Sequence, residues 1–133
     1  QTLRSADGWT IIDFEGEPAK TAQERRAFDS PWRDVAGMIR SFDYVRSAHP
    51  QPASPEATAW ADAARDAFVA GYAGDGPVRD DLLSGYVLDK AIYEVMYEIR
   101  NRPDWVGIPL RAVIDASVSG PDEPRLRRSD DVS

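Results

Sequence analysis

The chain has 133 residues, 42% of them hydrophobic, and a formal net charge of −7, so it can form one domain with a buried core. The negative charge argues against a nucleic-acid or anionic-membrane surface, because both need clustered Lys and Arg. The absence of cysteine excludes disulfides and thiolate metal sites, and no apolar run approaches the roughly 20 residues of a membrane span.

The first predicted element is a β-hairpin over residues 2–14. Its turn is expected at Asp7-Gly8, because this dipeptide is typical of tight hairpin turns between two short strands. The charged residues 15–30 show no apolar periodicity, and we expect them to form a loop.

An acidic segment over residues 13–18 follows the hairpin and carries a candidate metal site. Mg²⁺ takes oxygen ligands and is usually held by one or two carboxylates together with substrate phosphates. A tight hairpin returns the chain to its start, so the carboxamide of Gln1 can approach the carboxylates of Asp13 and Glu15. These three side chains are a plausible magnesium set, and an acidic exit loop on a surface hairpin is the alternative.

Two helices are predicted next, over about 31–47 and 55–73. Each is preceded by a serine, Ser30 or Ser54, that can cap the helix N-terminus, and each begins with a proline. Both contain apolar residues at helical spacing, so each is expected to bury one face.

A third helix is predicted over about 84–102, with Asp80 as an alternative start, and it should end before Pro103. A short last helix is expected over 109–116, and residues 118–133 have the composition of a disordered tail. The apolar stripe that the third helix is expected to bury consists of Leu88, Ala91, Ile92, Val95, Met96 and Ile99.

The polar face of the third helix combines carboxylates, a carboxamide and aromatic rings, which is what a sugar-binding surface needs. Carboxylates accept hydrogen bonds from hydroxyl groups, and an aromatic ring can cover the apolar face of a pyranose. From the pattern alone, a solvated acidic face is the favoured interpretation. The candidate substrate-binding residues are Glu94, Tyr97, Glu98, Asn101 and Trp105.

Six sequence blocks lie at residues 1–4, 8–9, 12–18, 30–44, 88–94 and 97–105. The long block at 30–44 and the run Asn-Arg-Pro-Asp-Trp at 101–105 are the most specific of them. Together these blocks, which span about residues 1–115, resemble the C-terminal lobe of actinobacterial maltokinases. Those enzymes belong to the aminoglycoside-phosphotransferase-like branch of the eukaryotic-type kinase fold.

The resemblance implies a mainly α fold with a short N-terminal β-hairpin over residues 1–117, the distal part of the C-lobe of a protein-kinase-like fold. It implies ATP-dependent phosphorylation of maltose to maltose 1-phosphate in α-glucan synthesis, with trehalose synthase as a partner. It also implies that Gln1, Asp13 and Glu15 bind Mg²⁺, that the helix carrying the candidate sugar contacts faces the substrate, and that Asp34 supports the catalytic loop.

In such an enzyme the catalytic aspartate and the nucleotide-binding lobe would precede Gln1. We therefore expect a fragment that is inactive alone and that dimerises through the apolar surface it leaves exposed; a complete, processed domain is the alternative. A glucosamine kinase of the same fold and an acidic helical interaction module without catalysis are the alternative functions. No signal peptide is visible, so we expect a cytoplasmic protein.

Overall fold

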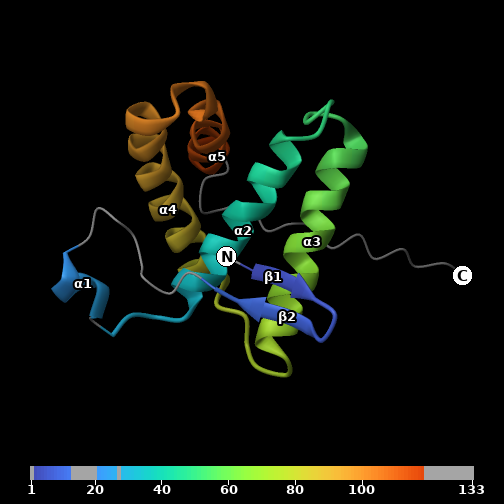
Figure 1. Ribbon diagram of the computed structural model, residues 1–133, viewed down its shortest axis with the longest axis vertical. Coiled ribbons are helices and arrows are strands. Elements are labelled where there is room, and N and C mark those ends of the chain that lie inside the picture. The colour runs from blue at the N-terminus through green and yellow to red at the C-terminus, as the bar shows by residue number, and fades with distance from the viewer. Residues whose placement is uncertain (1, 13–20, 27, 119–133) are drawn as a thin grey trace, which may run out of the picture. The chain divides into compact units, whose positions relative to one another are not determined.

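The computed structural model describes residues 2–12, 21–26 and 28–118 of the chain (Figure 1). The chain divides into two compact units, residues 1–30 and 31–133. Among the described residues the secondary structure is mainly helical with one two-stranded hairpin, in general agreement with the expected fold class. That these elements form a kinase C-lobe stays a prediction.

The first unit contains an antiparallel hairpin of β1 (Thr2–Ser5) and β2 (Gly8–Ile11). Ser5 pairs with Gly8 next to the turn, and Gly8 has a φ of 129°, a backbone conformation that side-chain-bearing residues rarely adopt. The second strand ends at Ile11, before the predicted boundary at residue 14. Residues 13–20, which include the predicted metal-binding loop from residue 13, lie outside the described residues.

The loop predicted over 15–30 contains a short helix, α1 (Ala22–Arg26), so that prediction was wrong for this segment. Thr21 and Glu24 explain the helix start. The Glu24 carboxylate accepts the backbone N–H of Thr21 at 2.8 Å, and the Thr21 hydroxyl accepts the backbone N–H of Glu24 at 3.2 Å. This reciprocal capping box satisfies two backbone donors that a helix end would otherwise leave open.

The second unit is a set of packed helices in which α2 lies between α3 and α4, and α5 packs against α4 (Figure 1). No helix among the described residues is long and apolar enough to cross a membrane. The elements are α2 (Trp32–Ser47), α3 (Pro55–Ala73), α4 (Asp80–Asn101), the 3₁₀ turn η1 (Pro103–Trp105) and α5 (Gly107–Val118).

The serine cap predicted for α3 is present, whereas the cap position of α2 differs from the prediction. The Ser54 hydroxyl accepts the backbone N–H of Ala57 at 3.2 Å, as expected for the start of α3. At the start of α2 the cap position belongs to Pro31, which has no side-chain cap bond, so the cap lies one residue later than predicted. Gly74 ends α3 at a φ of 54°, where its N–H donates to the Ala70 carbonyl.

The last two helices are longer than predicted. Helix α4 begins at Asp80, the alternative start, and ends at Asn101, so that Pro103 falls in η1. Helix α5 begins at Gly107 and includes Val118, which the sequence assigned to the tail. Pro109 lies in the first turn of α5, where its missing N–H costs no intrahelical hydrogen bond.

The core of the second unit joins α2 to the start of α4. It consists of Val35, Ala36, Ile39 and Leu83, with partly buried aromatic and aliphatic side chains around it. Further along α4 the predicted apolar stripe is only partly buried: Ala91 is fully buried, as predicted. Other members of the stripe are about half exposed, namely Ile92 at 51%, Met96 at 49% and Ile99 at 54%.

Candidate functional site

The two carboxylates on the acidic face of α4 are buried against α2, so for them the interpretation as a solvated face was wrong. Glu98 on α4 and Arg40 on α2 are each only 1% exposed. Glu94, one turn before Glu98, is largely buried as well. Buried charges are tolerated when each has a partner of opposite charge or several hydrogen bonds, and this pair of helices supplies both.

Arg40 is the centre of the first half of this network. Its Nε donates to the Glu94 carboxylate at 2.8 Å, and its Nη1 donates to the Asp43 carboxylate at 2.6 Å. Its Nη2 is buried and has no hydrogen-bond partner among the described residues. One cation thus joins a carboxylate of its own helix to a carboxylate of α4, which holds the two helices in register.

Glu98 is the centre of the second half. Its carboxylate accepts the hydroxyl of Tyr44 at 2.8 Å and two N–H groups of Arg102, at 2.9 and 2.6 Å. Burial and this hydrogen bond to Glu98 raise the pKa of Tyr44, so its hydroxyl stays protonated as a donor. The Arg102 guanidinium lies over the ring of Trp105, 4.7 Å from its centroid, and the Tyr44 ring lies beside the same indole.

The candidate sugar-binding residues therefore divide into two groups. Both oxygens of Glu98 are engaged inside the protein, and Glu94 bonds to Arg40. By contrast, Tyr97 is 37% exposed and Trp105 is 44% exposed. Asn101 is also exposed, and its amide donates to the backbone carbonyl of Tyr97 at 2.9 Å. The exposed group offers two aromatic rings and a carboxamide, and the buried carboxylates hold the helices that carry them.

The predicted metal ligands Gln1, Asp13 and Glu15 lie outside the described residues. Among the residues that are described, no group of three or more His, Cys, Asp or Glu side chains could hold a metal ion. Asp34 lies exposed in the first turn of α2, where its backbone N–H donates to the Pro31 carbonyl at 3.1 Å. Its role in supporting a catalytic loop stays a prediction.

The sequence reasoning missed four members of the network: Arg40, Asp43, Tyr44 and Arg102. A signal for Arg40 was present: it follows Ile39 on the helix face that Val35 and Ala36 also occupy, and a charged residue there needs a buried partner. Tyr44 lies four residues after Arg40, on the same side of α2. Their acceptors lie 54 positions away in the sequence, which no local pattern reveals.

The pH dependence of stability should reveal the desolvation of Glu94. Burial raises the pKa of this carboxyl, and the attraction of Arg40 offsets only part of the rise. As pH rises, Glu94 therefore loses its proton in the unfolded chain before it does so in the folded chain. Its contribution to the free energy of unfolding falls as pH rises from about 4.3, the ordinary pKa of Glu, through the raised pKa of the folded state. Above the folded value the loss is complete.

Urea unfolding at several pH values between 4 and 7 tests this sign. The stability of the unmodified chain, relative to Glu94→Gln, should decrease as pH rises, because the glutamine does not titrate. Glu56→Gln, the same substitution at an exposed position of α3, is the matched control. A relative stability that increases with pH would mean that the attraction of Arg40 outweighs burial.

Comparison with known proteins finds relatives that are kinases by name. The chain is 30% identical over 128 residues to a glucosamine kinase of Streptacidiphilus jiangxiensis, and this alignment covers 86% of this chain and 29% of that protein. It is 30% identical over 132 residues to a glucosamine kinase of Mycolicibacterium smegmatis, and this alignment covers 90% of this chain and 33% of that protein. The chain thus spans about a third of the length of these relatives. No family model matches it.

Proposed function

We propose that this chain is the C-lobe part of an ATP-dependent sugar kinase. The observation that carries the proposal is the similarity to two proteins named glucosamine kinase over 86% and 90% of the chain. The exposed rings and carboxamide at the end of α4 are compatible with it, because aromatic and amide groups suit sugar recognition. The resemblance to maltokinases and the names of the relatives agree on the transfer of a phosphoryl group to a sugar, whichever sugar is the acceptor.

We propose glucosamine as the acceptor and maltose as the second candidate. The names of the two relatives favour the amino sugar. Its protonated amine is a cation, which a chain with a net charge of −7 attracts. The blocks at residues 88–94 and 97–105 favour maltose through their resemblance to maltokinases, so the formation of maltose 1-phosphate stays a prediction.

In this proposal Tyr97, Asn101 and Trp105 contact the sugar, and Glu98 is a positioning residue that acts through Arg102. Gln1, Asp13 and Glu15 hold Mg²⁺; one carboxamide and two carboxylates are the kind of oxygen donors that this ion takes. The ion would neutralise charge on the phosphates of ATP. Trehalose synthase as a partner, a homodimer and a cytoplasmic location stay predictions.

The test uses the full-length natural protein that contains this chain. ATP consumption is measured with glucosamine, maltose or no sugar, and the proposal predicts turnover that depends on glucosamine. Turnover with maltose alone would shift the acceptor to the second candidate. No sugar-dependent turnover at all would overturn the kinase proposal and favour the acidic interaction module.

The same assay tests the proposed sugar contact of Trp105. Replacing its indole by alanine in Trp105→Ala should raise the KM for the sugar about 2- to 10-fold with little change in kcat, because a stacked aromatic ring contributes binding in both ground and transition states. Trp60→Ala, at an exposed indole on α3, is the matched control and should leave the KM unchanged. Equal KM values for both variants would remove Trp105 from the sugar site.

A further inference from the structure

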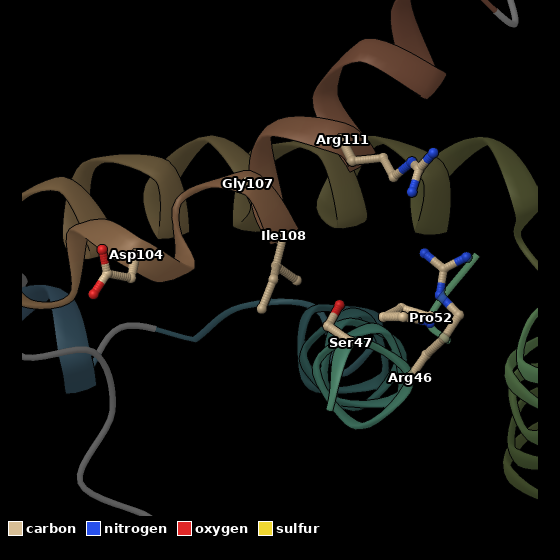
Figure 2. A pocket seen from close by; sticks show the side chains of 7 residues that line it. All are labelled: Arg46, Ser47, Pro52, Asp104, Gly107, Ile108 and Arg111. Carbon is tan, nitrogen blue, oxygen red and sulfur yellow. The ribbon is translucent and has the colours of Figure 1, made fainter. Parts of the chain in front are cut away.

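A cavity of about 180 Å³ lies where the C-terminal turn of α2 faces the first turns of α5. Arg46 reaches it from α2 and Arg111 reaches it from α5, and Figure 2 shows their guanidinium groups pointing toward one another. Both groups are permanently charged, so their approach is repulsive unless an anion lies between them. The candidate sugar-binding side chains on α4 do not line this cavity.

The two arginines have donors to spare. The Nε of Arg46 is buried without a hydrogen-bond partner among the described residues. The ion pair between Arg46 and Asp43 is long, at 3.5 Å, and the other oxygen of Asp43 accepts Arg40 at 2.6 Å. Within residues 28–118, no hydrogen bond or ion pair is found for the exposed side chain of Arg111. A guanidinium carries five N–H donors and no acceptor, so the cavity is rich in unused donors.

The rest of the lining also suits a negative ligand. Gly107 and Ile108 are the first residues of α5, and a helix begins with N–H groups that carry a partial positive charge. Pro52 and the side chain of Ile108 add apolar lining beside the two guanidinium groups. Asp104 is the carboxylate at this cavity, and Figure 2 shows it directed away from the two guanidinium groups.

We propose that this cavity binds an oxyanion of the phosphate class, either inorganic phosphate or the phosphate of a small phosphomonoester. Paired guanidinium groups bind phosphate through several charge-assisted hydrogen bonds at once, which gives both strength and geometric selectivity. A volume of about 180 Å³ exceeds several times the roughly 30 Å³ that one water occupies, so the anion can keep part of its hydration. With a net charge of −7 the chain as a whole repels anions, and binding requires this local site.

The test is a titration of the full 133-residue chain with sodium phosphate at constant ionic strength, followed by amide NMR shifts. The proposal predicts saturable shifts at Ser47, Gly107 and Ile108. Arg111→Gln, which alters an exposed side chain, should weaken binding at least about tenfold, as expected when charged hydrogen bonds are lost. Arg46→Gln should do the same, and Arg100→Gln, an equal change of charge at an exposed residue of α4, should leave binding unchanged.

Parallel titrations identify the source of the anion. Tighter binding of glycerol phosphate than of inorganic phosphate assigns the site to a phosphomonoester, and the reverse order assigns it to the free anion; both support the proposal. Shifts that never saturate, equal weakening in Arg111→Gln and Arg100→Gln, or acetate binding as tight as phosphate would each overturn it. These outcomes do not depend on kinase activity and so leave the proposed function to its own test.

Discussion

Arg40→Met is expected to lower the free energy of unfolding by about 3–5 kcal/mol, the cost of removing one partner from a buried ion pair. Arg40 is 1% exposed and compensates both Glu94 and Asp43. Methionine fills a similar volume with an unbranched chain, so little cavity is created. The decrease in stability therefore reflects the cost of leaving a carboxylate inside the protein without a cation. Urea unfolding followed by tryptophan fluorescence measures this decrease.

Two further variants separate this explanation from a simple loss of packing. Arg40→Met combined with Glu94→Leu should recover most of the lost stability, because replacing a buried ion pair by apolar groups is often neutral or stabilising. Asp89→Asn breaks an exposed ion pair with Arg33 of similar length, 2.7 Å, and should cost less than about 1 kcal/mol. If the double variant is as unstable as Arg40→Met, the charge explanation fails.

Local signals predicted the helices better than they predicted which faces are buried. Proline and glycine set most of the helix boundaries: Ser54 and the proline after it start α3, Gly74 ends it, and Pro103 follows the end of α4. These residues act on the backbone next to them, so their effect can be predicted from the sequence alone. The capping box at Thr21 and Glu24 is an equally local signal that was overlooked.

The buried face of α4 could not be predicted in this way. Apolar periodicity assigns Ile92, Met96 and Ile99 to the core, yet each is about half exposed, while Glu98 is buried and bonded to α2. A buried carboxylate needs hydrogen-bond donors; Arg102 supplies two of them from nearby in the sequence, but the third is Tyr44 on α2, 54 residues earlier. The pattern of one helix contains no information about the charge of its neighbour.

The same reasoning explains what was and was not predictable in the candidate site. Trp105 could be selected because an aromatic residue just after an acidic helix is visible in the sequence. The arrangement of an exposed Trp105 and a buried Glu98 could not be predicted, because Arg102 bridges the carboxylate and the indole. In the proposed site, the orientation of the exposed groups therefore depends on the buried charges behind them.

Glu98→Ala tests this dependence and is expected to lower the free energy of unfolding by about 2–4 kcal/mol. The variant leaves the Tyr44 hydroxyl without its acceptor, and Arg102, which is 46% exposed, can turn toward water. The cost should therefore be smaller than that of Arg40→Met. Urea unfolding measures it, and Asp66→Ala, at an exposed position of α3, should stay within about 0.5 kcal/mol of the unmodified chain.

If Glu98 has only a structural role, Glu98→Ala changes stability alone. If Glu98 also positions the indole, the variant changes the surroundings of Trp105 under fully native conditions. Without Glu98, the Arg102 guanidinium is no longer held over the indole, so the NMR signal of the Trp105 ring N–H should shift and broaden in the folded variant. Glu98→Gln should restore part of the signal, since its amide oxygen can still accept from Arg102. An unchanged Trp105 signal in folded Glu98→Ala would show that the buried carboxylate stabilises the helices without orienting the exposed ring.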